Sequence, residues 1–164
     1  MLNKNLTMLE IYGIAIKSEI DAAKAYSEMK NRIENPDLKK KLGFLKNEET
    51  KHRKLLTTQY KNQFPDVKLS LPKQGLAPKL NLALENNAPL AKLFELAMAA
   101  ENDSERFYAE AAKQAQDPTG KKLLHYLSGM ERSHYYLLKA EYDLIQQFEK
   151  FESYKKFSQE HIGP

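Results

Sequence analysis

Two sets of glutamate, tyrosine and histidine residues with identical spacing carry the chemistry that this sequence offers. Each set begins with a Glu, has a Tyr seven residues later and ends with a Glu-x-x-His motif that starts thirty residues after the first Glu. A single Glu-x-x-His arises by chance in many helical proteins, but a second copy with the same upstream residues indicates a duplicated site. The sets lie 82 residues apart and consist of Glu19, Tyr26, Glu49 and His52, and of Glu101, Tyr108, Glu131 and His134.

The four glutamates and two histidines form a suitable donor set for two metal ions. Four carboxylates that converge in a protein core cannot all stay ionised without cations, because like charges raise one another's pKa. Carboxylate and imidazole donors suit divalent first-row metals, and iron or manganese is favoured over a metal that prefers thiolates. We predict that Glu49 and Glu131 bridge the two metals. The terminal pairs are then Glu19 with His52 and Glu101 with His134, and they could be exchanged between the metals.

Helical periodicity places both sets on long helices. Glu49 and His52 share a face with Leu45, at i+4 and i+7, so they point into the core with the apolar residues of that helix. Asn35-Pro36 separates the first two helices, since Asn caps a helix and Pro suits its first turn. The predicted long helices span about 6–34, about 36–63, about 90–116, and a stretch that opens at Asp117-Pro118.

The helical rise aligns the members of each set. Glu19 precedes Asn35 by 16 residues, which is roughly 24 Å of helix. Glu49 and His52 follow the same turn by 14 and 17 residues, or roughly 21 and 26 Å. The three side chains therefore meet at one height in an antiparallel hairpin, and the second hairpin repeats this register. Two such hairpins can join through their polar centres across a two-fold axis, which makes the third long helix parallel to the second.

The segment of about 64–89 must then run the length of the bundle. It contains four prolines and Gly75, an alternating stretch at 67–71 and a short helix expected at about 79–85. A segment of this length reaches well beyond the roughly 40 Å that the crossover requires. We predict an all-α four-helix bundle. Its two repeated hairpins span about 6–63 and about 90–147, with the crossover at about 64–89 and an aromatic tail at about 148–164.

The composition bounds the class of protein. With 164 residues, the chain fits one domain over 1–164 with a substantial core. The absence of cysteine excludes disulfides, Cys-ligated zinc, iron–sulfur clusters and a thiol nucleophile. A net charge of +4 with interspersed Lys and Glu is typical of a solvated helical surface, and no basic block with aromatics indicates binding to nucleic acid. Residues 1–7 lack signal-peptide features and no stretch approaches roughly 20 apolar residues, so we expect a cytoplasmic protein without a membrane partner.

The ligand order resembles that of the ferritin-like di-iron carboxylate family, which has Glu, Glu-x-x-His, Glu and Glu-x-x-His on four successive helices. Within it, the length, the Glu-x6-Tyr elements and the twofold repeat resemble the rubrerythrin branch, over about residues 6–147. The resemblance implies a ferritin-like fold and two iron ions, with manganese as an alternative. It also implies an oxidoreductase that reduces hydrogen peroxide or dioxygen and so protects the cell from them.

Two features depart from the rubrerythrin pattern. Full-length rubrerythrins append a Cys-ligated iron centre, which a Cys-free chain cannot have, so a separate electron-donor protein is implied. They also carry an additional ligating Glu on the third long helix, where this chain has Ser104 followed by Glu105. The remaining six-residue set is closer to that of bacterioferritins, and a ferroxidase that oxidises Fe(II) is therefore the first alternative. A di-iron monooxygenase is the second, and a helical interaction module that has lost its metals is the third.

Alternatives also stay open for residues around the site. The six Glu and His residues could instead form a hydrogen-bonded polar layer or surface pairs, but the matched register of the two sets argues against this. Tyr26 and Tyr108 are either core aromatics or hydrogen-bond donors to the ligating carboxylates.

Other polar and aromatic residues receive simpler interpretations. Solvent-facing positions are expected for Asp21, Asp103, Glu48, His125 and His161. The tail either extends the last helix or folds back as a short amphipathic helix against the bundle or a partner. The apolar surface of the crossover and tail suggests a homodimer. The tail aromatics are Phe148, Phe151, Tyr154 and Phe157.

Overall fold

Five helices make up the regular structure of residues 6–161, the part of the chain that this computed structural model describes. Side chains are described for residues 6–148 other than Leu82. Within residues 6–161 the fold contains helices and no strands, so the predicted all-α class is confirmed. The helices are α1 (Met8–Asn31), α2 (Pro36–Gln63), α3 (Pro78–Glu85), α4 (Leu90–Gln114) and α5 (Pro118–His161).

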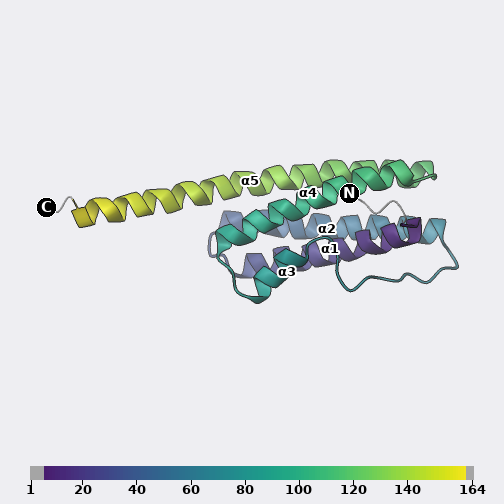
Figure 1. Cartoon of the computed structure of the whole chain (residues 1–164), viewed down its shortest axis with the longest axis horizontal. Helices are drawn as coiled ribbons and strands as arrows, with labels where there is room; N and C mark the ends of the chain where they lie inside the picture. Colours follow the sequence, from purple (N-terminus) through teal and green to yellow (C-terminus); the bar gives the residue numbers. More distant parts are fainter. Residues whose placement is uncertain (1–5, 162–164) are drawn as a thin grey trace.

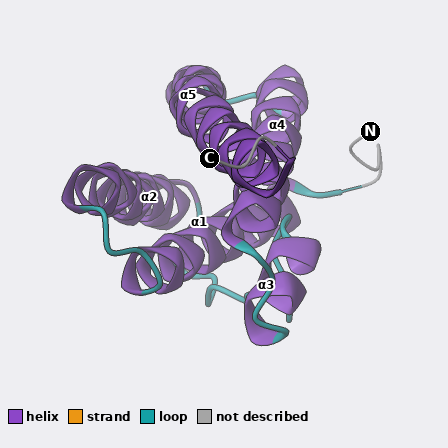
Figure 2. Cartoon of the chain, turned by 90° about the vertical axis from the view of Figure 1, so that its left-hand side faces the viewer, coloured by secondary structure: helices purple, strands orange, loops and turns teal. Residues whose placement is uncertain are grey.

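The four long helices form two antiparallel hairpins. α1 packs side by side with α2, and α4 packs with α5 (Figures 1 and 2). The colours of Figure 1 show that α1 and α5 run in one direction, whereas α2 and α4 run in the other. α4 is therefore parallel to α2, as the predicted two-fold relation between the hairpins requires.

Side-chain caps close the turn within each hairpin. The Asn35 side chain accepts hydrogen bonds from the backbone N–H groups of Asp37 and Leu38, both at 3.0 Å. At the equivalent turn, the Asp117 carboxylate accepts a hydrogen bond from the backbone N–H of Gly120 at 2.6 Å. The predicted ends of the first three long helices and the predicted start of the fourth agree with the structure to within about three residues, because caps are local in sequence.

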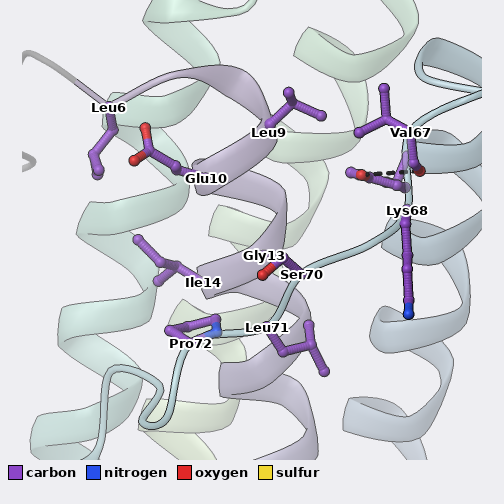
Figure 3. A pocket seen from close by; sticks show the side chains of 11 residues that line it. Leu6, Leu9, Glu10, Gly13, Ile14, Val67, Lys68, Ser70, Leu71 and Pro72 are labelled. Atoms are coloured by element: carbon purple, nitrogen blue, oxygen red, sulfur yellow. Dashed lines mark hydrogen bonds between the residues drawn. The ribbon is translucent and has the colours of Figure 1, made fainter.

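The crossover, residues 64–89, follows α1 along the length of the bundle as predicted (Figure 1). Its residues 64–77 have no regular secondary structure, and α3 follows them. Two glycines mark close approaches to α1. An ideal Cβ on Gly13 would lie 2.6 Å from the carbonyl oxygen of Ser70, a pair that Figure 3 labels, and one on Gly75 would lie 2.7 Å from Cα of Ser18. Because both distances are below van der Waals contact, the crossover can lie this close only where a side chain is absent.

The last helix settles how the aromatic tail is arranged. α5 continues without a break to His161 and extends well past the turn between α1 and α2 (Figure 1). Residues 148–161 of the tail therefore extend the fourth long helix and do not fold back on the bundle. Phe148 is 69% exposed, whereas the side chains of Phe151, Tyr154 and Phe157 lie outside the described residues. No described helix combines the length with the apolar character that crossing a membrane requires.

The core consists of two apolar clusters with a polar layer between them. Every long helix contributes to both clusters. One lies toward the start of α1 and includes Ile16, Leu56 and Leu127, and the other lies toward its end and includes Met29 and Phe94. Apart from Gln59, the buried polar side chains lie along each helix between these two clusters.

The close approach at Gly75 and the open space around Gly129 predict opposite effects for the same substitution at these two glycines. Gly75→Ala is expected to lower the free energy of unfolding by about 1–3 kcal/mol, because the new methyl group collides with the α1 backbone at Ser18. Gly129 lies in α5 with nothing within 4 Å of an ideal Cβ, so Gly129→Ala should raise that free energy by about 0.5–1 kcal/mol. Urea unfolding measures both. Equal stability of Gly75→Ala and the unsubstituted protein would contradict the packing described for the crossover.

Candidate dimetal centre

Six polar side chains from the four long helices meet in the layer between the two apolar clusters. None of them is more than 4% exposed. The structure thus brings together every residue that the sequence predicts as a ligand, at the predicted height in each hairpin. They are Glu19 of α1, Glu49 and His52 of α2, Glu101 of α4, and Glu131 and His134 of α5.

The six residues form two overlapping groups, each able to surround one cation. Within each group the donor atoms all lie within 4.8 Å of one another. Glu49 and Glu131 belong to both groups, which is the position that bridging ligands take between two ions. The groups are Glu19, Glu49, His52 and Glu131, and Glu49, Glu101, Glu131 and His134.

Both imidazoles point the same ring nitrogen at the carboxylates. Nδ1 of His52 lies 3.3 Å from Oε2 of Glu49, 3.3 Å from Oε1 of Glu131 and 3.5 Å from Oε2 of Glu19. Nδ1 of His134 lies 2.9 Å from Oε1 of Glu49 and 3.5 Å from Oε2 of Glu131. The two rings stack with centroids 5.4 Å apart and an interplanar angle of 16°. Each Nδ1 is therefore directed at the centre of one group.

The two tyrosines connect the hairpins through crossed hydrogen bonds. Tyr26 of the first hairpin donates to Oε1 of Glu101 in the second, and Tyr108 of the second donates to Oε1 of Glu19 in the first. Both side chains are fully buried. Burial and the nearby carboxylate charge raise the pKa of each phenol well above its usual value, so both hydroxyls remain donors. Tyr26 and Tyr108 are therefore hydrogen-bond donors to carboxylates of the site, which is one of the two roles considered for them.

Burial and neighbouring charges divide the four carboxylates into two kinds. Burial and the charge of Glu131 raise the pKa of Glu19 and of Glu101 well above the usual range. Burial acts in the same direction on Glu49 and Glu131. Contacts with both histidines outweigh it at Glu49, and contacts with Glu101 and both histidines outweigh it at Glu131, so the pKa of each of these two is lowered. The two carboxylates common to both groups are thus the ones held in the ionised form.

Unsatisfied polar atoms test whether cations fit this layer. Of nine buried side-chain nitrogen and oxygen atoms without a hydrogen-bond partner among the described residues, seven belong to the six site residues. They include one oxygen each of Glu19, Glu49 and Glu131, and both ring nitrogens of each histidine. Leaving so many polar groups unpaired in a core is costly. Two divalent cations would satisfy the carboxylate oxygens and the Nδ1 atoms together, so the donor set fits a dimetal centre.

The surroundings of the cluster differ on its two sides. A cavity of about 20 Å³ between α1 and α4 touches all four carboxylates. On the opposite side, a groove of about 370 Å³ between α2 and α5 touches His52, whose ring meets the edge of Tyr126 at 6.5 Å between centroids. A further pocket of about 370 Å³, between the start of α1 and the crossover (Figure 3), contains none of the six residues.

Two residues expected to face solvent are buried. Asp21 is 7% exposed because the crossover covers it, and its carboxylate accepts a hydrogen bond from the backbone N–H of Gly75 at 3.1 Å. Glu48 is 8% exposed and pairs with Lys51 at 2.5 Å. The sequence carries no signal for the burial of Asp21, because its angular position on α1 does not tell what packs on that side.

The other residues expected at the surface fall into two groups. Asp103 and His125 are exposed, as expected. The side chain of His161 lies outside the described residues. Neither exposed residue belongs to the two donor groups.

A helical bundle with four carboxylates and two imidazoles buried at its centre is the architecture of ferritin-like dimetal proteins. The sequence model of the family described as Rubrerythrin matches residues 10–142, and the chain belongs to this family. A solved structure of a hypothetical protein from Pyrococcus furiosus is similar over 88% of this chain and 93% of that chain, with 32% sequence identity and a TM-score of 0.77. No functionally curated protein gives a significant match. Family membership and the buried cluster together indicate a di-iron type of site.

The histidines predict a pH dependence for the protein freed of metal by a chelator. Burial opposes protonation of His134, but contacts with Glu131 and Glu49 outweigh it and raise its pKa from 6.5 to about 9. A raised pKa means that the protonated imidazole stabilises the fold. This contribution is complete below pH 6.5 and is lost as the pH rises through about 9; it is on the order of 3 kcal/mol.

Urea unfolding of the chelator-treated protein near the two ends of this window measures the effect. The free energy of unfolding should be lower at the alkaline end. In His134→Gln, which cannot gain the proton, the difference between the two pH values should shrink. Equal stability at both ends of the window in the unsubstituted protein would show that His134 is not held in its protonated form.

Proposed function

We propose that the protein is a di-iron oxidoreductase that reduces hydrogen peroxide, or dioxygen, at the site between its four long helices. The observation that carries this proposal is the pair of overlapping donor groups that share Glu49 and Glu131. In the proposed site these two carboxylates would be shared by both ions as bridging ligands. Glu19 with His52 and Glu101 with His134 would be the terminal pairs, and manganese is the alternative metal.

When bound, two ferrous ions supply the two electrons that reduce one peroxide (H2O2 + 2 H⁺ + 2 e⁻ → 2 H2O), and a separate electron-donor protein returns those electrons. The residues of the chain would hold the two ions and exclude bulk water from the buried layer.

The exposed apolar residues, among them Phe148, support the proposal that two copies of the chain associate as a homodimer.

The proposed role of the two tyrosines is to orient the terminal carboxylates. Because Tyr108 engages Oε1 of Glu19, the other oxygen, Oε2, is left to face Nδ1 of His52 at 3.5 Å. Tyr26 leaves Oε2 of Glu101 in the corresponding position, 3.8 Å from Nδ1 of His134. Hydrogen bonds of this kind hold a ligating carboxylate in one orientation.

One observation favours ferroxidase activity as a second candidate function. Ser104 borders the cavity beside the carboxylates, at the position where the rubrerythrin pattern has an additional ligating Glu. The neighbouring Glu105 turns to Arg132 and forms an ion pair with it. No seventh carboxylate among the described residues joins the two donor groups, and such a symmetric six-residue set resembles that of bacterioferritins.

Metal stoichiometry tests the proposed sharing of ligands. Glu49→Ala removes a ligand from both groups, so binding of both Fe(II) ions should weaken roughly 100-fold or more. Glu19→Ala removes a ligand from one group, so one ion should still bind normally. Anaerobic titration calorimetry with Fe(II) measures both, and Glu110→Ala, at an exposed glutamate of α4, is the control that should bind two ions. Equal losses in Glu49→Ala and Glu19→Ala would contradict the bridging role.

Stopped-flow absorbance distinguishes the two candidate reactions. The protein is loaded anaerobically with two Fe(II) per chain and mixed with peroxide or with dioxygen. Oxidation should be faster with peroxide by roughly tenfold or more. A tenfold difference in rate corresponds to about 1.36 kcal/mol of activation free energy. Faster oxidation by dioxygen, with iron released or accumulating beyond two ions per chain, would overturn peroxide reduction in favour of ferroxidase activity.

A further inference from the structure

The two sides of the dimetal cluster differ in what covers them. The cavity touches all four carboxylates and neither histidine, whereas the groove touches His52 and none of these four carboxylates. α3 packs against α1 and α4, and therefore lies on the cavity side (Figure 2). A small molecule that reaches the carboxylates from this side must pass the crossover.

Small side chains line the cavity, and crossover residues form its roof. Its volume of about 20 Å³ is room for roughly one water-sized molecule. The roof consists of Leu76, Ala77 and Leu80, and Leu80 is only 3% exposed. The small residues of the wall are Ser18, Ala22, Ala100 and Ser104.

Two hydrogen bonds from the crossover to side chains of α1 hold this roof in place. The backbone N–H of Gly75 donates to Oδ2 of Asp21 at 3.1 Å, and that of Leu76 donates to Oγ of Ser18 at 3.0 Å. Asp103 occupies the equivalent position in the second repeat, but its side chain is 53% exposed. The repeat is therefore broken at this pair, and Asp21 alone of the two contacts the crossover.

We propose that the roof of Leu76, Ala77 and Leu80 sets a size limit for the oxidant, admitting hydrogen peroxide or dioxygen to the carboxylates and excluding organic hydroperoxides. Asp21 is the positioning residue that keeps the roof closed. The identity of the small oxidant rests on the proposed function. The size limit does not, because it follows from the cavity and its roof.

Ligand binding to the cobalt(II)-loaded protein tests the size limit without turnover. Formate and pivalate share a carboxylate, but pivalate carries a tert-butyl group, so the pair differs mainly in bulk. The visible absorption of cobalt(II) reports a new ligand. The unsubstituted protein should bind formate at least roughly 100-fold more tightly than pivalate.

Two independent variants should relax this preference. Leu80→Ala removes bulk from the roof, and Asp21→Ala removes one of its anchors, so in both the preference should fall to roughly tenfold or less. Leu55→Ala makes the same change at a 44% exposed residue of the groove, and Asp103→Ala removes the counterpart of Asp21. These two controls should keep the full preference. If Leu80→Ala does not fold, Asp21→Ala still tests the roof.

The same variants are then compared in iron-loaded form with hydrogen peroxide and tert-butyl hydroperoxide. Two electrons and two protons reduce the latter to tert-butanol and water. The rate with hydrogen peroxide divided by the rate with tert-butyl hydroperoxide should fall at least roughly tenfold in Leu80→Ala and Asp21→Ala, but not in the two controls.

Each outcome decides between the alternatives. Equal binding of pivalate and formate by the unsubstituted protein, or a change in Leu55→Ala but not in the roof variants, would overturn the roof and indicate entry through the groove. A roof effect on cobalt(II) ligands together with no peroxide reduction by the iron-loaded protein would support the size limit and reject the proposed function. A failure of the size limit can thus be distinguished from a failure of the proposed function.

Discussion

The burial of four carboxylates in one layer is the constraint on which the rest of the structure depends. Removing such charges from water is costly unless positive charge and hydrogen bonds compensate for it. Here part of the compensation comes from across the hairpin boundary, since Tyr26 and Tyr108 each donate to a glutamate of the other hairpin. The electrostatic demand of the site therefore joins the two halves of the bundle, and neither half can satisfy its own polar layer alone.

The crossover gives this symmetric layer two unlike sides. The ligand layer obeys the two-fold relation, because each hairpin contributes the same residues at the same height. The crossover cannot obey it, because a single segment connects the hairpins and packs along α1. As a result Asp21 is buried beneath the crossover, whereas its repeat counterpart Asp103 faces solvent. The symmetric part suits the binding of two cations, and the asymmetric part controls access to them.

Particular residues show why some features were predictable and others were not. The common height of Glu19, Glu49 and His52 followed from the constant rise of a helix and the turn at Asn35, both of which are local. The predictions that Asp21 and Glu48 face solvent were wrong for one shared reason. Their angular offset from the ligands shows that they point away from the donor groups, but it does not show what else packs there.

The sequence by itself determined the helical class, the hairpin register, the need for a long crossover and the six residues that meet at the centre. All of these depend on spacing along single helices, which the helical repeat converts directly into position. Only the tertiary structure decided that α5 continues straight past the bundle, that the tyrosine bonds cross between hairpins, and that a roof covers the carboxylates and leaves the histidine side to a groove. These features depend on which surfaces face each other, and contacts between segments distant in the chain set that arrangement.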